Sequence, residues 1–450
     1  MKNILSCIAT LLALALPAAA QEVDPGIFKI PPSAKVKIDR HNICRMVHNT
    51  TPSDTFMVGA GSASEWSSGP NAFLNVVIPG LNIMTCGPQP ICPVATRNYT
   101  KVADVDPKYI AFSPDSSEFF ALSFTVNESD LLIYGRKGNK WTQKQALPVE
   151  KGIGWGKLYG NSIGFSEDGR RAVILPTTYS AAPNQMKMLE LNKNASGVWS
   201  VQQKILTLSH PATVINSVKF FGDTNDTVVF TWNVGSTDVP AASIIKRNAS
   251  GAWSVQSSLP RPSLAINPID VWLFGDGDRA YVTAEANPTN NNNFYPTWSA
   301  DYKLANGKWS IVRTGSGAPR TLSADGLTGA SFTYALILPG WEFSNSKAHL
   351  YTRSNPDQAF SLTHSLAVNN ANCCSNMEMS ADGSTIAANT FAALYPAATM
   401  VFNVVNGKLV NRGVPLPPVK TDFLMDWPKL SATGDVVFNN GQIAYGCSMP

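Results

Sequence analysis

The sequence predicts an all-β protein, a β-propeller built from four-stranded blades. A ten-residue segment occurs twice, as KNASGVWSVQ at 193–202 and RNASGAWSVQ at 247–256, and the two copies are 54 positions apart. A turn motif recurs at a similar spacing, and short β-type runs fill the sequence between the turns. A period of roughly fifty residues with four short strands per unit is typical of propellers.

The aromatic residue of the duplicated segment marks one position that recurs along the chain. Trp199 and Trp253 occupy it in the two copies. Equivalent positions are held by Trp141, Trp309, Phe360 and Leu409, and Tyr99 is a candidate earlier copy. The intervals from Trp141 onward are 58, 54, 56, 51 and 49 residues. We interpret the Asn-Ala-Ser-Gly segment as the turn between the third and fourth strands of a blade, and the aromatic residue as the start of the fourth strand.

A second marker keeps the same period and ends in a turn rich in Asp, Gly and Ser. Its copies are FSPDS at 112, FSEDG at 165, FFGDT at 220, LFGDG at 273, LSADG at 322, MSADG at 379 and LSATGD at 430. Such residues favour tight hairpin turns. After FSEDG, the runs RRAVILP, MKMLELN and VWSVQQKIL supply three further strands. We therefore place this marker between the first and second strands of each blade.

The markers predict seven blades. The last unit, 422–450, has room for only three strands, so we expect an N-terminal strand to complete it and close the ring. Eight blades are the alternative, with a degenerate blade around FMVGAG (56–61) and FLNVVIP (73–79). The expected organisation is a signal peptide over 1–20, an N-terminal segment over 21–100 that supplies the closing strand, and the propeller over 101–450.

These repeated units resemble the Asp-Gly repeats of the WD-like and FG-GAP classes of secreted propellers. The resemblance covers roughly 108–450 and rests on FSEDG, the β-type run after it and the closing ASGVWSVQ. It implies the fold and says little about function. The calcium loop of FG-GAP repeats is missing, and the nearest approaches are at 223–226 and 276–278. We expect neither a metal nor a cofactor.

The N-terminus and the composition indicate an exported protein. Lys2, the apolar run ILSCIATLLALAL and Ala18-Ala19-Ala20 have the order of a signal peptide. No later apolar run is long enough to span a membrane. The formal net charge is only +4 and no basic block occurs, which argues against nucleic-acid binding. We expect a monomer that is secreted or periplasmic.

Seven cysteines become six after signal-peptide removal, and an even number in an exported chain suggests disulfides. Cys86 and Cys92 bracket a short loop that a disulfide would close. Cys44 and Cys447 come from opposite ends of the mature chain, where a bond would fasten the closing blade. The neighbours Cys373 and Cys374 would then form a vicinal disulfide. In the alternative, each pairs elsewhere, for instance Cys374 with Cys44.

Aromatic residues in the longer loops indicate a binding rim. In a propeller, loops between second and third strands, and loops between blades, lie on the rim opposite the tight hairpins. The candidate ligand-binding residues of this rim are Trp155, Tyr179, Trp232, Tyr295, Trp298, Trp341 and Tyr395. Aromatic faces beside polar groups suit a sugar. In the alternative interpretation these residues cap the core and stiffen the loops.

Catalytic signals are weak. The five histidines show no metal-ligand spacing and no nucleophile motif occurs. His210 and His364 lie near connections between blades, so each is a candidate base or a structural residue. The count of acidic residues is low for a carboxylate cluster around the channel. The first hypothesis is therefore a module that binds a glycan or a protein through the aromatic rim. A hydrolase or lyase with its site at the channel mouth is the alternative, and a scaffold without a small ligand is the third.

Overall fold

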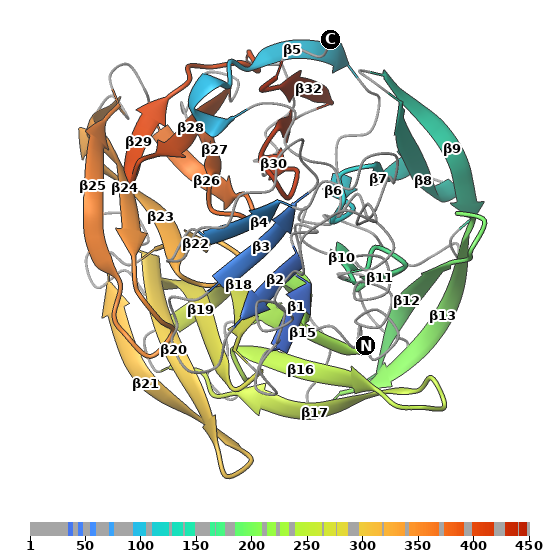
Figure 1. Ribbon diagram of the computed structural model, residues 1–450. Coiled ribbons are helices and arrows are strands. Elements are labelled where there is room, and N and C mark those ends of the chain that lie inside the picture. Colours follow the sequence, from blue (N-terminus) through green and yellow to red (C-terminus); the bar gives the residue numbers. More distant parts are fainter. Residues whose placement is uncertain are drawn as a thin grey trace, which may run out of the picture. The chain divides into compact units, whose positions relative to one another are not determined.

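The computed structural model confirms an all-β ring of seven blades (Figure 1). It describes residues 35–38, 44–47, 55–59, 72–75, 93–104, 110–125, 128–137, 140–148, 163–166, 168–175, 185–208, 214–221, 226–233, 239–262, 265–275, 277–286, 297–316, 319–337, 342–368, 373–390, 398–417, 428–439 and 441–447. In each blade four antiparallel strands follow one another from the centre of the ring outward.

Four blades form the first part of the ring. The first blade contains β6 (Ile110–Phe112), β7 (Glu118–Thr125), β8 (Glu128–Lys137) and β9 (Lys140–Pro148). The second contains β10 (Ile163–Phe165), β11 (Arg171–Ile174), β12 (Gln185–Lys193) and β13 (Trp199–Thr207). The third contains β14 (Val214–Phe221), β15 (Thr227–Asn233), β16 (Ala242–Arg247) and β17 (Trp253–Leu259). The fourth contains β18 (Ala265–Phe274), β19 (Arg279–Ala286), β20 (Thr297–Ala305) and β21 (Lys308–Ser316).

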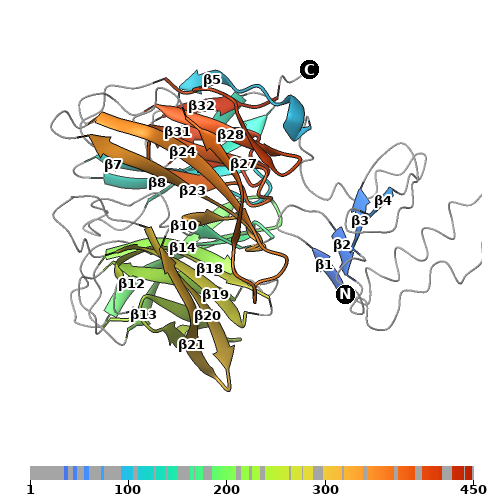
Figure 2. The ribbon, with the colours of Figure 1, turned by 90° about the vertical axis from the view of Figure 1, so that its left-hand side faces the viewer.

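Three further blades complete the ring, which Figure 2 shows from the side. The fifth blade contains β22 (Thr321–Leu322), β23 (Thr328–Ile337), β24 (Glu342–Thr352) and β25 (Ser361–Ala367). The sixth contains β26 (Cys373–Met379), β27 (Thr385–Thr390), β28 (Thr399–Val405) and β29 (Lys408–Asn411). The seventh contains β30 (Lys429–Leu430), β31 (Val436–Asn439), β32 (Gln442–Tyr445) and β5 (Thr100–Asp104).

The seventh blade confirms the predicted closure. Its outermost strand is β5, which pairs antiparallel with β32 although more than three hundred residues separate the two in the sequence. The closing strand begins at Thr100, so four of its five residues lie beyond the segment 21–100 that was expected to supply it. A short 3-10 helix, η1 (Val94–Thr96), precedes the strand. Tyr99, directly before β5, holds the repeated aromatic position and is buried.

The eighth-blade alternative is not realised in the ring. The chain divides into two compact units, 1–89 and 90–450. The first unit contains a separate sheet of β1 (Lys35–Ile38), β2 (Cys44–Val47), β3 (Thr55–Gly59) and β4 (Ala72–Asn75). Its last pair, β3 and β4, is parallel, whereas the blades of the second unit are antiparallel throughout. FMVGAG and FLNVVIP therefore belong in part to a sheet of the first unit.

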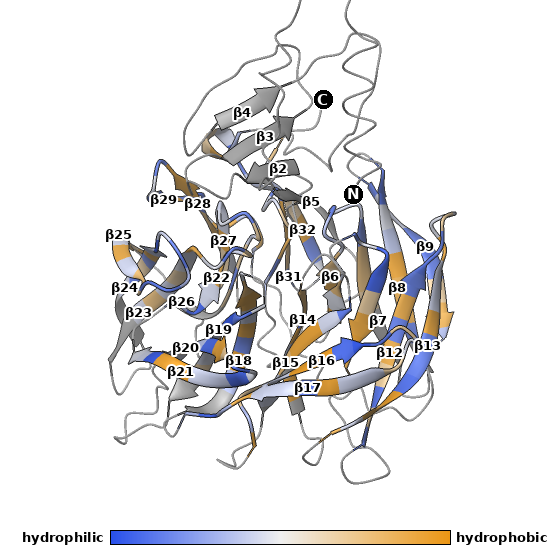
Figure 3. Ribbon diagram, turned by 60° about the horizontal axis from the view of Figure 1, so that its bottom comes forward, coloured by the Kyte–Doolittle hydropathy of each residue, from blue (hydrophilic) through white to orange (hydrophobic). Residues whose placement is uncertain are grey.

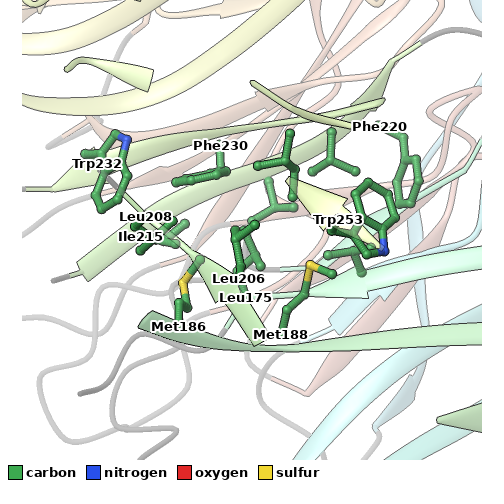
Figure 4. Close-up of a cluster of buried hydrophobic side chains, with 14 of the residues drawn as sticks. Leu175, Met186, Met188, Leu206, Leu208, Ile215, Phe220, Phe230, Trp232 and Trp253 are labelled. Atoms are coloured by element: carbon green, nitrogen blue, oxygen red, sulfur yellow. The ribbon is translucent and has the colours of Figure 1, made fainter. Parts of the chain in front are cut away.

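Burial alternates along the strands as a propeller requires. The outermost strands β9, β13, β17 and β21 change repeatedly between hydrophilic and hydrophobic residues (Figure 3), because one face packs on a neighbouring blade and the other meets water. Middle strands such as β15 are buried through most of their length. The core consists of apolar clusters between adjacent blades. One of them packs Met188, Phe230 and Trp253 from the second and third blades (Figure 4).

The duplicated segment binds a carboxylate of the preceding blade at two junctions between blades. Lys193 and Trp199 of the second blade both bind Glu118 of the first, at 2.9 Å from Nζ and 3.0 Å from Nε1 to the carboxylate. One junction further on, Arg247 and Trp253 bind Glu190, at 2.9 Å and 3.2 Å. Each copy thus supplies a cation and an indole N–H that bind a buried carboxylate of the preceding blade.

Candidate functional site

A layer of equivalent side chains lies on the innermost strands, around the channel that a propeller encloses. The layer consists of the residue directly before each hairpin marker. In order of the blades these residues are Ala111, Gly164, Lys219, Trp272, Thr321, Glu378 and Lys429. Three of the seven are charged. The innermost strands, which carry these residues, surround the centre of the ring (Figure 1).

Lys219 of β14 is bound by the next blade. Its Nζ lies 2.7 Å from Oδ2 of Asp270 and 3.6 Å from the centroid of the Trp272 ring, both on β18. The other oxygen of Asp270, Oδ1, accepts hydrogen bonds from Ser217 Oγ and, at 2.8 Å, from the backbone N–H of Val271. Three donors therefore hold the Asp270 carboxylate, and the carboxylate in turn positions Lys219.

Glu378 of β26 pairs with Lys429 of β30, where Nζ lies 3.2 Å from Oε2. Burial raises the pKa of the Glu378 carboxyl above its ordinary value. The positive charges of Lys429 and Lys219 act in the opposite direction without outweighing the burial, and the negative charge of Asp270 adds to the rise. Burial likewise lowers the pKa of Lys219, and the charge and hydrogen bond of Asp270 oppose this shift.

These four residues form one electrostatic group, which we call the axial cluster: Lys219, Asp270, Glu378 and Lys429. The side chains of Lys219 and Glu378 keep 27% and 30% of their surface exposed. They therefore reach water although they lie deep within the ring. With all four ionised, the cluster has no net charge.

The strands that carry the axial cluster are irregular. The pairing of β14 shifts between Ile215 and Val218, and that of β18 shifts between Pro268 and Asp270. The pairing of β26 also shifts, between Cys373 and Met377. Bulges of this kind redirect side chains and are frequent beside functional sites. Here each shift directly precedes a member of the cluster or lies within two residues of one.

Two predicted rim aromatics lie in the core, which corrects their assignment as ligand-binding residues. Trp232 lies on β15, is fully buried, and donates a hydrogen bond from Nε1 to Ser243 Oγ at 2.8 Å. Figure 4 shows it at one end of the cluster between the second and third blades. Trp298 lies on β20 and is 5% exposed, within the core between the third and fourth blades. The prediction failed because both residues belong to strands, whereas it placed them in loops.

The remaining predicted rim residues lie outside the described residues: Trp155, Tyr179, Tyr295, Trp341 and Tyr395. Their role as a ligand-binding rim stays a prediction.

The cysteine pairing also stays a prediction. Cys44 begins β2, Cys373 and Cys374 begin β26, and Cys447 is buried two residues after β32. Cys86 and Cys92 lie outside the described residues.

Of the two candidate histidines, His210 and His364, the structure describes His364. Nδ1 of His364, on the outermost strand β25, accepts a hydrogen bond from the backbone N–H of Leu409 in the next blade, at 3.2 Å. This contact favours the structural interpretation of His364. His210 lies outside the described residues. Among the described residues, no group of three or more His, Cys, Asp and Glu side chains is arranged to hold a metal ion.

Sequence reasoning missed the axial cluster, since acidic residues appeared too few for a site at the channel. A usable signal was present in the residue directly before each hairpin marker. When the repeats are aligned, this position is charged in three of them, at Lys219, Glu378 and Lys429, and uncharged in the others. Asp270 needs the structure, because it lies two residues before the equivalent position, Trp272.

No protein-family model matches the sequence, and comparison with curated proteins finds no match. Solved structures with a similar fold include a protein from Lactobacillus plantarum, with 13% identity, a TM-score of 0.47, and coverage of 70% of this chain and 87% of that one. Another is a periplasmic gluconolactonase of Pseudomonas aeruginosa, with 14% identity, a TM-score of 0.46, and coverage of 79% and 97%. A third is Chaetomium thermophilum Sqt1 bound to the N-terminus of ribosomal protein L10, with 12% identity, a TM-score of 0.43, and coverage of 78% and 98%.

The fold thus defines the class of protein: residues 90–450 contain a seven-bladed β-propeller. The similar structures differ in what their names say they do, and likeness at this level carries no argument about the activity of this chain. Among the described residues, no helix is long and apolar enough to cross a membrane.

Proposed function

We propose that this protein is an exported β-propeller that binds a glycan, and that the axial cluster is the centre of its binding site. The observation that carries the proposal is the cluster itself: two Lys–carboxylate pairs on four inner strands, with Lys219 and Glu378 partly exposed. Buried ion pairs contribute little to stability, because desolvation offsets their attraction. Ionisable groups with shifted pKa values are candidates for functional sites.

A hydroxyl-rich ligand suits this chemistry. Ammonium groups donate hydrogen bonds and carboxylates accept them, so the cluster offers both kinds of partner to sugar hydroxyls. The predicted rim aromatics that lie outside the described residues, such as Trp341, would add stacking surfaces for the rest of a glycan. The signal-peptide pattern at 1–20 supports export, which would bring the protein into contact with extracellular or periplasmic glycans.

A glycan-array screen of the mature protein tests this proposal. We expect the wild type to bind, and Lys219→Met to lose binding while it retains a cooperative unfolding transition. Lys219→Arg keeps the positive charge and controls for damage to the fold. Lys308→Met, in an exposed hairpin outside the cluster, is the matched control and should bind like the wild type. If the wild type binds no glycan, the proposal is wrong, and pull-down experiments should then search for a protein ligand.

A hydrolase or lyase acting at the same cluster is the second candidate. Burial raises the pKa of Glu378, so a larger share of this carboxyl stays protonated near neutral pH, as a general acid requires. Incubation of array-positive oligosaccharides with wild type and Glu378→Gln tests this candidate. Product formation that Glu378→Gln abolishes supports an enzyme, and intact oligosaccharide after prolonged incubation with the wild type excludes catalysis on that glycan.

A further inference from the structure

The outermost strands of the blades share an irregularity that β13 lacks. In five of the seven blades, the outermost strand holds one extra residue that has no partner in the neighbouring strand. This residue lies three positions after the repeated aromatic position, at Val102, Lys144, Gln256, Val312 and Thr363. In the sixth blade the outermost strand, β29, has only four residues. In contrast, β13 pairs with β12 without any shift over all nine residues from Trp199 to Thr207.

An outermost strand is the edge of its sheet, and its unpaired backbone groups can pair with a strand of another chain. Bulges and very short strands are the usual means by which proteins prevent such pairing. Among the described strands, β13 is the one long outermost strand that has neither protection, and it lies on the outside of the ring (Figure 1). It also carries an exposed apolar side chain, Ile205, which is 52% exposed. Its edge therefore keeps the geometry that strand addition needs.

Hydrogen bonds show which residues of β13 direct their backbone away from β12. The N–H of Trp199 donates to Oε1 of Gln145 in the first blade at 3.0 Å, and its C=O accepts from Nε2 of Gln145 at 2.6 Å. Backbone direction alternates along an antiparallel strand, so Val201, Gln203 and Ile205 also point their N–H and C=O groups outward. No group among the described residues makes a hydrogen bond to the backbone of these three.

We propose that two copies of this chain associate through β13, with the two strands antiparallel and a two-fold axis at Gln203. In this register Gln203 lies opposite Gln203 of the second copy, and Val201 lies opposite Ile205. Each of these pairs joins residues whose backbone groups point outward, so every pair can exchange two N–H···O=C hydrogen bonds. The second blades of the two copies then form one continuous sheet.

The side chains of β13 favour a second copy as the occupant of this edge. Residues that lie opposite each other share one face of the sheet, so Val201 covers the exposed Ile205, and the two-fold axis repeats this contact. The strand has one charged side chain, Lys204, whose Nζ lies 3.9 Å from Oε2 of Glu190 in its own blade. In the two-fold register Lys204 lies opposite Gln202, so no like charges meet. This dimer departs from the monomer expected from the sequence, and it does not depend on the proposed glycan site.

Analytical ultracentrifugation of the mature protein over a series of concentrations tests the inference. We expect the wild type to change from monomer to dimer as its concentration rises. Gln203→Glu and Gln203→Lys should each weaken the dimer by about tenfold or more, because each places two like charges opposite each other at the two-fold axis. An equimolar mixture of the two variants should dimerise again, because Glu then faces Lys. Gln256→Glu, at the bulge of β17, is the matched control and should dimerise like the wild type.

The outcomes decide both the interface and its register. Thermal unfolding of each variant shows that the charges leave the fold intact, so a lost dimer can be attributed to the interface. A wild type that stays monomeric at every concentration overturns the inference. So does a dimer that Gln203→Glu leaves unchanged, because the contact then lies elsewhere on the molecule. If both variants at Gln203 are monomeric but their mixture does not associate, the two-fold register is wrong and the inference fails.

Discussion

The hairpin turns between the first and second strands require one residue with a positive φ angle. The fifth residue of the marker adopts a left-handed conformation, with φ of 64° at Gly169, 70° at Gly326, 72° at Gly383 and 68° at Gly434. In the first blade this place is held by Ser116, with φ of 54°. Left-handed backbone costs a residue with a Cβ about 1 kcal/mol, whereas glycine adopts it freely. Ser116 is therefore the strained copy of the turn.

Ser116→Gly should stabilise the protein by about 0.5–1 kcal/mol, because it removes this strain. It also removes a buried Oγ that has no hydrogen-bonding partner among the described residues. Chemical denaturation monitored by tryptophan fluorescence measures the change. Gly169→Ser places the same strain in the next blade and should destabilise by a similar amount. A lower midpoint for Ser116→Gly would contradict this account.

At the scale of the element, a carboxylate of one blade and a cation of the next recur at several junctions. Glu118 binds Lys193, and Glu190 binds Arg247. Asp301 of β20 lies 2.8 Å from Arg353, which follows β24 and lies 4.2 Å from the centroid of the Phe360 ring. Asp435 and Arg136 make the corresponding contact, at 3.5 Å, between the seventh blade and the first. The aromatic residue and the cationic residue of the repeat therefore both contribute contacts between neighbouring blades.

Glu190→Gln should cost about 2 kcal/mol, because it removes the charge of a fully buried carboxylate that pairs with Arg247 and Arg171 and accepts a hydrogen bond from Trp253. Asp357→Asn is the matched control. Asp357 pairs with Arg279 while 60% exposed, so its loss should cost roughly 0–1 kcal/mol. Urea denaturation of both variants at pH 7 measures the difference. Equal losses in the two variants would show that the inter-blade pair is no stronger than a surface pair.

Acid stability should depend on Glu118. Burial raises the pKa of this carboxyl, but hydrogen bonds from Lys144, Lys193 and Trp199 outweigh it, and the pKa ends below 4.5. A native pKa below the unfolded one means that Glu118 stabilises the fold above about pH 4.5 and loses this contribution as pH falls through the lowered native value. Glu118→Gln should therefore lower stability at pH 7 and have a smaller effect near pH 3. Thermal unfolding of both proteins from pH 3 to 7 checks this, and a gap that stays constant with pH would refute it.

At the scale of the whole molecule, ring closure depends on a strand brought from the other end of the propeller. Tyr99 lies directly before β5 and is buried at the junction of the sixth and seventh blades. Its hydroxyl donates to the carbonyl of Gly434 and accepts a hydrogen bond from Asn403 Nδ2 at 3.2 Å. Arg97 adds a hydrogen bond to the carbonyl of Thr433 at 2.7 Å. The first residues of the propeller thus contact two blades near its C-terminal end.

Tyr99→Ala should destabilise the ring by about 3–5 kcal/mol, because it removes a buried aromatic ring at the closure. Tyr99→Phe keeps the ring and loses the hydroxyl contacts, at a cost of about 1 kcal/mol. Calorimetric unfolding of both variants tests the role of the closure. Similar small losses in the two variants would mean that the aromatic ring of Tyr99 contributes little to holding the propeller together.

The sequence by itself determined the repeat, the four-strand unit and the N-terminal closure, and it favoured seven blades over the alternative of eight. These features follow from local signals, namely turn residues, strand alternation and an aromatic position. Each signal is repeated so often that it stays recognisable although one copy, Leu409, lacks the aromatic residue. Only the tertiary structure decided which side chains meet. Trp232 and Trp298 were assigned to loops from the sequence. In the structure they lie on β15 and β20, near the strand ends, and their side chains are buried in the core. Lys219, Asp270, Glu378 and Lys429 are separated by up to 210 positions, and closure of the ring brings their charges together.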